Sequence, residues 1–214
     1  MQNGSELLIQ KIKSRARNSL LFGIGAIALG LVGGYLFLPL TPEGKLLDTG
    51  SQQDISVIIL FVVSLLVILY GIIKIIRSAS VMADPKRDKT VKNNPDVFSM
   101  ADELYRGITY KDSQMTMSER VIANTGDLTE IAYTDEVFIA YVFTHRTNGV
   151  PDRKYLWLET ARGDIKLDVF KLKDEQINAL MQKVLTSCKY AKAGYSNEAK
   201  AYVKQMREKW KEGR

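Results

Sequence analysis

Two long runs of uncharged, apolar residues constrain this chain more than any other feature. Residues 19–40 contain no charged side chain, and residues 55–76 contain only Lys74. Because a helix rises about 1.5 Å per residue, each run covers roughly 30 Å, the thickness of the hydrocarbon core of a bilayer. Residues 41–54 between them are polar and short. The sequence therefore predicts a transmembrane helical hairpin over residues 19–77, with spans at about 19–40 and 55–76.

A cleaved signal peptide is an alternative interpretation of the first run. Its apolar length exceeds the roughly 7–15 residues of a signal-peptide core, and no small-x-small cleavage site follows it. We therefore interpret it as a retained anchor. In the second run, Lys74 lies one turn from the end, so its stem can lie along the helix while the ammonium reaches the headgroups.

The distribution of Lys and Arg predicts the orientation of the hairpin. Basic residues flank both runs on the sides away from the connecting loop, whereas the loop contains only Lys45. The positive-inside rule then places both termini in the cytoplasm, including a basic N-terminus over residues 1–18, and makes the chain a multi-pass protein of the cell (inner) membrane. We expect the flanking residues to contact anionic inner-leaflet lipids. These predicted membrane-surface residues are Lys11, Lys13, Arg15, Arg17, Arg77, Lys86 and Arg87.

The glycines of the first run have two possible roles. Gly23, Gly25 and Ala28 match the G-x-G-x-x-A outline of a dinucleotide-binding turn, but that motif needs a preceding strand, and "KSRARNSL" is not one. No cofactor is therefore predicted. Small residues four apart instead form a face that lets another helix approach closely, either the second span or a second copy of the chain in a homo-oligomer. The predicted helix-packing residues are Gly23, Ala26, Gly30, Gly33 and Gly34.

The remainder of the chain predicts an α+β cytoplasmic domain. Residues 78–96 are interpreted as a linker and residues 97–190 as the domain, which opens with a short helix over residues 98–107. A helix with one apolar face, which includes Cys188, closes the domain over residues 173–188. Alternating and β-branched segments between the two helices predict strands. The predicted strands are residues 114–124, 128–134, 136–146, 154–160 and 165–170, with a loop at 147–152 and a turn at 161–164.

Several antiparallel strands followed by one packing helix have the outline of a pleckstrin-homology-like (PH-like) fold, a bent sheet or partial barrel closed by a C-terminal helix. The segments "EIAYTDEVFIAYVF", "YLWLETARGDIKLDVF" and "AKAGYSNEAKAYVKQ" carry a further similarity. The chain resembles bacterial two-span membrane proteins with a cytoplasmic PH-like (YcxB-like) domain, whose function is mostly unassigned. The matching residues are Tyr133, Asp135, Val137, Phe138, Gly163, Gly194, Tyr195, Ser196 and Glu198. An additional residue, Glu136, interrupts the Tyr-Asp segment.

Two short motifs in the domain do not predict ligands. The basic pattern of lipid-binding PH domains would need a cation between Lys111 and Arg120, but position 118 is serine. Residues 88–190 also carry 14 basic and 16 acidic groups, a net charge of −2, which suits neither phosphoinositides nor nucleic acid. Arg162-Gly163-Asp164 spells a cell-adhesion tripeptide, which we interpret as a hairpin turn.

Residues 191–214 predict a basic amphipathic C-terminal helix, which Ser196 can cap. Its apolar stripe either packs on the domain or brings Trp210 to the inner leaflet. The stripe consists of Ala199, Tyr202, Val203, Met206 and Trp210, and the opposite face carries Lys200, Lys204, Arg207 and Lys211.

Side chains that could support catalysis are few. The chain has one cysteine and one histidine, His145, so an intrachain disulfide and most zinc sites are excluded. We predict a non-enzymatic, membrane-anchored protein that binds protein or peptide partners through its PH-like domain, with Tyr155, Trp157 and Trp210 as the candidate partner surface. The alternative is an accessory subunit of an oligomeric transporter or channel, assembled through the glycine-rich span.

Overall fold

The computed structural model describes residues 3–38 and 52–212, which form two compact units. The first comprises residues 1–11 and 89–214, and the second comprises residues 12–88. Helix α1 (Gly4–Leu36) begins in the first unit and continues without interruption into the second.

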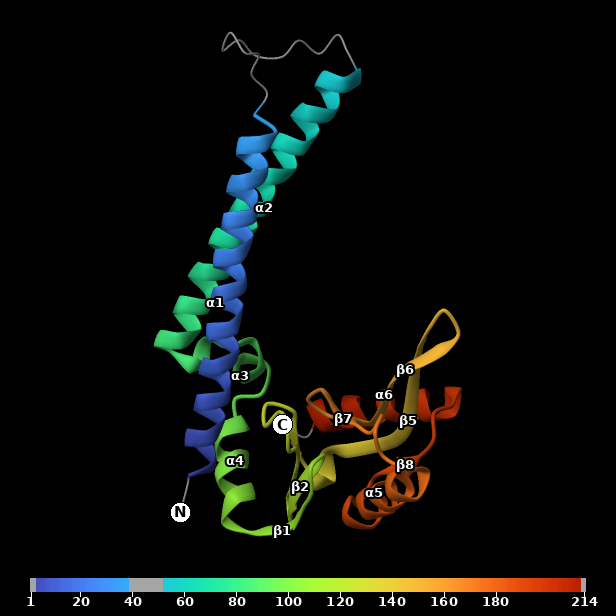
Figure 1. Ribbon diagram of the computed structural model, residues 1–214. Helices are drawn as coiled ribbons and strands as arrows, with labels where there is room; N and C mark the ends of the chain where they lie inside the picture. Colours follow the sequence, from blue (N-terminus) through green and yellow to red (C-terminus); the bar gives the residue numbers. More distant parts are fainter. Residues whose placement is uncertain (1–2, 39–51, 213–214) are drawn as a thin grey trace. The chain divides into compact units, whose positions relative to one another are not determined.

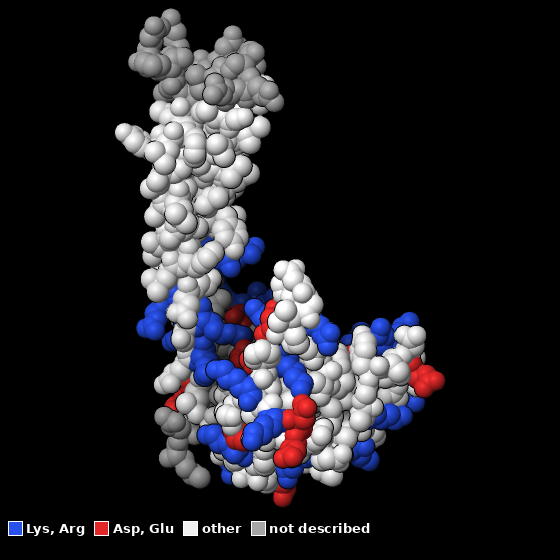
Figure 2. Space-filling model, turned by 45° about the vertical axis from the view of Figure 1, so that its right-hand side comes forward, with Lys and Arg blue, Asp and Glu red and all other residues white. Residues whose placement is uncertain are grey.

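The second unit is built from the two predicted apolar helices. α1 and α2 (Gln52–Ala83) are both long and apolar enough to cross a membrane. Large apolar side chains cover their outer surfaces; Leu29 is 73% exposed and Leu66 is 58% exposed. Figure 2 shows that most of the described length of this helical pair carries no Lys, Arg, Asp or Glu side chain. Such a surface suits a lipid environment.

The helix boundaries differ from those that the sequence predicts. α1 starts at Gly4 rather than near residue 19, and it ends at Leu36 because Pro39 disfavours a helical conformation at residue 38. α2 continues to Ala83, through part of the predicted linker, and a short 3₁₀ helix (η1, Pro85–Arg87) follows. The loop predicted at residues 41–54, with Lys45, lies mostly outside the described residues.

The first unit contains an α+β arrangement with two four-stranded sheets. Residues 89–106 are helical, as α3 (Lys89–Asn93) and α4 (Val97–Arg106). The first sheet has the order β1-β2-β3-β4, and all its pairs are antiparallel. Its strands are β1 (Ile108–Lys111), β2 (Met115–Ser118), β3 (Val121–Asn124) and β4 (Ile131–Tyr133).

The second sheet follows a 3₁₀ turn, η2 (Thr134–Glu136), and has the order β7-β6-β5-β8. β8 pairs with β5 in parallel, and the other pairs are antiparallel. The β5–β6 hairpin extends beyond the other strands of this sheet (Figure 1). The strands are β5 (Val137–Thr147), β6 (Val150–Thr160), β7 (Asp164–Asp168) and β8 (Lys192–Ala193).

Two features of the strand prediction are wrong. Residues 114–124 are not one strand but the hairpin β2–β3, in which Met117 pairs with Ile122. Nearly every residue of both strands is buried, so no alternation of polar and apolar residues marks the turn. Residues 147–152 are not an open loop, because Asn148 and Gly149 form a tight turn with positive φ angles of 52° and 81°. Such a two-residue turn matches the twist of the flanking strands.

Helix α5 (Asp174–Ser187) covers the core between the sheets. Ile177, Leu180, Val184 and Cys188 are at most 3% exposed and pack with buried side chains of both sheets. This confirms the apolar face that the sequence predicts. Burial raises the pKa of the Cys188 thiol to about 12, so the thiol stays protonated at neutral pH.

Helix α6 (Asn197–Glu212) packs on the domain through its apolar stripe. Val203 is 3% exposed and forms a small core with Phe138 and Ile139 of β5. Ser196 Oγ accepts a hydrogen bond from the amide of Ala199 at 3.1 Å, as expected of a helix cap. Of the two roles considered for the stripe, the structure shows packing on the domain.

Candidate functional site

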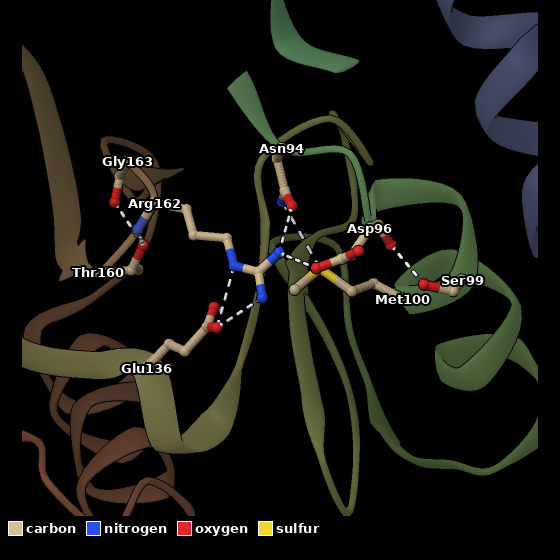
Figure 3. Close-up of polar contacts among 8 residues, drawn as sticks. All are labelled: Asn94, Asp96, Ser99, Met100, Glu136, Thr160, Arg162 and Gly163. Atoms are coloured by element: carbon tan, nitrogen blue, oxygen red, sulfur yellow. Dashed lines mark hydrogen bonds and ion pairs between the residues drawn. The ribbon is translucent and has the colours of Figure 1, made fainter. Parts of the chain in front are cut away.

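A cluster of polar side chains surrounds Arg162, at the turn between β6 and β7. The Arg162 side chain is only 7% exposed. Its Nη2 atom lies 2.8 Å from Glu136 Oε1, and its Nη1 atom lies 2.5 Å from Asp96 Oδ2. Nη1 also donates a hydrogen bond to Asn94 Oδ1 at 2.8 Å. Figure 3 shows the guanidinium reaching from the β6–β7 turn to side chains of two other segments.

Local structure positions each member of the cluster. The Arg162 amide donates to Thr160 Oγ1 at 3.3 Å, and Thr160 Oγ1 donates to the Gly163 carbonyl, which closes the turn. Glu136 ends the 3₁₀ turn that leads into β5. Asp96 precedes α4, and its carbonyl accepts a hydrogen bond from Ser99 Oγ at 2.8 Å.

Burial governs the electrostatics of this cluster. Desolvation raises the pKa of Glu136, and the hydrogen bond and charge of Arg162 act against that rise. Burial would lower the pKa of Arg162, but Asp96 and Glu136 outweigh it and raise this pKa. Among the described residues, Glu136 Oε2 has no hydrogen-bond partner and is buried. The guanidinium thus acts as a cross-link between three segments and remains charged.

A cavity of about 400 Å³ adjoins the cluster. The Arg162 guanidinium lies 5.5 Å from the Tyr133 ring centroid and 5.2 Å from that of Trp210. Both distances are within the range of cation–π attraction. Trp210 therefore joins the end of α6 to the cluster. The cavity is lined by Arg120, Tyr133, Asp135, Glu136, Phe138, Arg162, Tyr190, Met206, Lys209 and Trp210.

A second feature is a row of aromatic rings on one face of the β5–β6 hairpin, which we call the aromatic face. Its rings are Tyr141, Phe143, Tyr155 and Trp157 of the hairpin, together with Tyr195, which follows β8 and packs on Tyr141. Tyr141 stacks on Trp157 at 6.2 Å, and Phe143 meets Trp157 edge-on at 5.7 Å. Tyr195 lies 4.6 Å from Tyr141, and Tyr155 pairs with Phe143 across the strands.

The aromatic face is only partly covered by the rest of the domain. Tyr155 and Trp157 are half-buried, and Phe143 is 41% exposed. Lys166 Nζ lies 4.1 Å from the Trp157 ring centroid. Trp157 Nε1 is buried without a hydrogen-bond partner among the described residues. Of the three predicted partner-surface residues, Tyr155 and Trp157 lie on this face, and Trp210 lies in the Arg162 cluster.

The predicted helix-packing residues of α1 face α2 of the same chain, and they differ in how closely they approach it. A Cβ atom at Gly23 would lie 3.0 Å from the Gly71 carbonyl oxygen, and one at Gly30 would lie 2.5 Å from Ile68 Cγ1 and 2.9 Å from the Ser64 carbonyl oxygen. Ala26, between them, is 9% exposed. The two helices are antiparallel, since α2 residues decrease in number along α1.

The other two predicted glycines meet only Ser64. A Cβ atom at Gly33 would lie 2.6 Å from Ser64 Oγ, whereas one at Gly34 would be 4.0 Å from Ser64 Cβ. Ser64 Oγ donates a hydrogen bond to the Leu60 carbonyl at 2.9 Å. Gly23 and Gly30 therefore lie close to backbone atoms of α2, including the Gly71 carbonyl, whereas Gly33 lies close only to the Ser64 side chain.

The predicted membrane-surface residues are exposed. The exposed residues include Lys13, Arg15, Arg17, Arg77 and Lys86. Lys11 and Arg87 are exposed as well. Lys11 Nζ donates to the Gly126 carbonyl at 2.8 Å, and Arg87 donates to Ser80 Oγ at 2.9 Å.

Sequence reasoning missed the pairing of Arg162 with Glu136 and Asp96. Arg162 falls in a predicted hairpin turn, Asp96 falls in the predicted linker, and Glu136 is a carboxylate for which the sequence shows no pairing. The one available signal was Glu136 itself, an acidic residue immediately before the apolar segment "VFIAYVF". A charge next to a buried strand needs a partner, but the sequence does not show which one.

Within residues 3–38 and 52–212, no group of three or more His, Cys, Asp or Glu side chains is arranged to hold a metal ion. Comparisons of the chain with protein-family models, with curated proteins and with solved structures find no match.

Proposed function

We propose that this chain is a non-catalytic, membrane-anchored protein that presents a PH-like domain to protein or peptide partners at the cytoplasmic face of the cell membrane. The observation that carries this proposal is the aromatic face. It lies on a folded α+β unit whose chain also supplies two helices of membrane-spanning length. A protein with no partner for this face would leave large aromatic surface in water.

The arrangement of the domain supports the PH-like assignment. Two mainly antiparallel sheets are followed by a helix, α5, whose apolar side enters the core between them. β8 then pairs with β5, and α6 forms a separate small core with Phe138 and Ile139 of β5. This order agrees with a bent sheet closed by a C-terminal helix.

The composition of the aromatic face supports a protein partner. Exposed Tyr, Trp and Phe side chains provide large contact areas at low entropic cost, and they dominate binding energy at many protein interfaces. Lys166 beside Trp157 adds a cation at the edge. A partner segment could pack its apolar side chains on the aromatic rings and pair a carboxylate with the Lys166 ammonium.

The structure offers less support for the transporter alternative. Assembly through the small-residue face needs that face to be available to other subunits. Gly23 and Gly30 already lie against Gly71, Ser64 and Ile68 of the same chain. An oligomer would have to form through other surfaces of the two helices.

Substitution of one aromatic side chain tests the proposal. The wild type, Phe143→Ala and Phe170→Ala would each be expressed as affinity-tagged full-length chains, cross-linked in cells and purified in detergent. The proteins that co-purify with each chain would then be quantified. Phe143 belongs to the aromatic face and is 41% exposed, whereas Phe170 follows β7 and is 47% exposed. Loss of an aromatic anchor costs about 2 kcal/mol, so we expect recovery of specific partners to fall by roughly 30-fold for Phe143→Ala only. Equal recovery from all three proteins would show that partners do not bind through this face.

A further inference from the structure

The outer part of the β5–β6 hairpin, residues 142–153, has no support from the rest of the domain. We call this segment the distal hairpin, and every one of its residues is exposed. Along β6, pairing with β7 begins only at Tyr155. Along β5, pairing with β8 involves only Ile139 and Ala140. Within the described residues, both edges of the distal hairpin are therefore open.

The open edge also exposes backbone groups. The Gly194 amide donates to the Ala140 carbonyl at 3.0 Å, so the polar groups of Ala140 point away from β6. Because these groups alternate along a strand, those of Val142 and Thr144 point the same way, beyond the end of β8. A two-stranded ribbon with open edges is marginally stable in water and prone to pairing with other chains. These properties indicate that another surface covers the distal hairpin.

Its side chains indicate the chemistry of that surface. Val142 is 38% exposed, Val150 is 66% exposed, and Pro151 follows Val150. Arg146 and Arg153 are exposed on the same segment. Apolar side chains interspersed with arginines are typical of segments that lie among the headgroups of anionic lipids.

The one acidic residue of the distal hairpin is already paired. Asp152 Oδ1 lies 2.7 Å from His145 Nδ1, and Thr147 donates to Asp152 Oδ2 at 2.8 Å. Just outside the segment, Lys154 Nζ is paired with Asp174 at 2.7 Å. Arg146 and Arg153 thus give the segment a net positive charge, which favours an anionic surface.

The chain keeps the domain close to such a surface. Only residues 84–88 connect the end of α2 to the first unit. A chain of that length spans at most about 18 Å. This step rests on the membrane anchoring that is part of the proposed function. With the helices in a bilayer, a lipid surface is always within reach of the domain, whereas a soluble partner must be encountered by diffusion.

We propose that the distal hairpin docks on the anionic surface of the membrane that holds α1 and α2. Val150 and Pro151 enter the headgroup layer, and Arg146 and Arg153 bind lipid phosphates. Arg146, Val150, Pro151 and Arg153 lie nearer the turn of the hairpin than Phe143, the one residue that belongs to both the distal hairpin and the aromatic face. This docking holds the domain in one orientation at the bilayer.

A single fluorescent label tests this docking. The only native thiol, Cys188, is buried and its pKa is about 12, so an introduced cysteine can be labelled selectively. Full-length Val150→Cys would be labelled and reconstituted in nanodiscs of phosphatidylcholine, with or without phosphatidylglycerol, that contain a headgroup-attached nitroxide quencher. Gln182→Cys, at an exposed position of α5, is the matched control.

We expect strong quenching at position 150 in the anionic nanodiscs and weak quenching at position 182. Adding Arg146→Glu and Arg153→Glu should lower the ratio of docked to undocked hairpin by at least about five-fold per residue, since each basic residue near an anionic surface contributes about that factor. Equal quenching at both positions in anionic nanodiscs would overturn the docking proposal and leave the anchoring intact. Failure of the chain to enter nanodiscs would overturn both.

An experiment in detergent distinguishes whether a lipid surface or a protein covers the distal hairpin. The label at position 150 should stay water-exposed at every protein concentration in uncharged detergent micelles. Shielding that increases with protein concentration would instead show edge-to-edge pairing of two copies. Shielding by an added acidic peptide of alternating Val and Glu, without lipid, would show strand addition by a protein partner. Either result contradicts docking on lipid.

Discussion

At the scale of single residues, Arg162 determines how three segments of the domain meet. Its guanidinium contacts Glu136 before β5 and Asp96 before α4, and it lies beneath Trp210 of α6. Replacing both partners of a buried ion pair can leave stability unchanged, but removing one partner leaves the other as a buried charge without a counter-ion. The Glu136 side chain is 5% exposed, so it has little access to water as a substitute. The free energy of unfolding should therefore fall more when one of Arg162 and Glu136 is replaced than when both are replaced together.

Arg162→Ala should destabilise the domain by roughly 3–5 kcal/mol, because Glu136 keeps its burial and loses its counter-ion. The measurement is the free energy of unfolding of the full-length chain in detergent, followed by tryptophan fluorescence. Arg146→Ala, at an exposed position, should change it by no more than about 0.5 kcal/mol. The double variant Arg162→Ala/Glu136→Ala should lose less than the sum of its single variants. Strict additivity, or equal effects of Arg162→Ala and Arg146→Ala, would contradict this role.

At the scale of elements, the contact between α1 and α2 depends on a few glycines. Gly23 and Gly71 approach each other from opposite helices, and Gly30 faces Ser64 and Ile68. Gly25 is on the same helix, but a Cβ atom there would meet nothing within 4 Å. The glycines of the G-x-G-x-x-A pattern therefore differ in role. Gly23 allows close packing, and Gly25 lies away from the contact.

Gly30→Ala should weaken the helix pair by about 1–3 kcal/mol, because the new methyl group overlaps Ile68 and the Ser64 carbonyl and must push the helices apart. Gly25→Ala is the matched control. It should leave stability unchanged or raise it slightly, since alanine restricts the unfolded chain more than glycine does. The readout is thermal unfolding of the full-length chain in detergent, with helicity measured by circular dichroism. If Gly25→Ala is destabilised as much as Gly30→Ala, the loss of stability does not come from the contact between Gly30 and α2.

At the scale of the whole molecule, the N-terminal turns of α1 belong to the same compact unit as the α+β domain. Asp102 Oδ1 of α4 accepts a hydrogen bond from the Ser5 amide at 2.6 Å. Lys11 reaches the Gly126 carbonyl, and Leu8 is fully buried. Gly4 fits closely against the Ala101 carbonyl, where a side chain would overlap it. The domain is therefore assembled from residues 4–11 together with residues that follow the two long helices.

Leu8→Ala should destabilise this unit by about 2–5 kcal/mol, the cost of truncating a fully buried leucine. Gln10→Ala, two residues away and exposed, should have almost no effect. Unfolding can be followed by reaction of Cys188 with a maleimide, because the thiol is buried in the folded domain and accessible once it unfolds. If Leu8→Ala and Gln10→Ala expose Cys188 at the same denaturant concentration, residues 4–11 do not contribute to the core.

Local patterns in the sequence were sufficient for features that depend on neighbouring residues. Two helices of spanning length, the apolar face of α5 and the turn near Gly163 all follow from periodicity, charge and chain-breaking residues. The β2–β3 hairpin escaped prediction because strands that are buried throughout show no alternation. The PH-like fold, the cytoplasmic orientation and the absence of enzymatic activity remain predictions.

The sequence by itself determined which segments are apolar and where basic residues cluster, because these properties are set by residues within a few turns of one another. Only the tertiary structure decided that Arg162 pairs with Glu136 and Asp96, that Gly30 lies closer to α2 than Gly34 does, and that the first turns of α1 join the domain. Each of these contacts links positions far apart in the chain. Packing selects the partners in these contacts, and the choice of partner leaves no periodic pattern in the sequence.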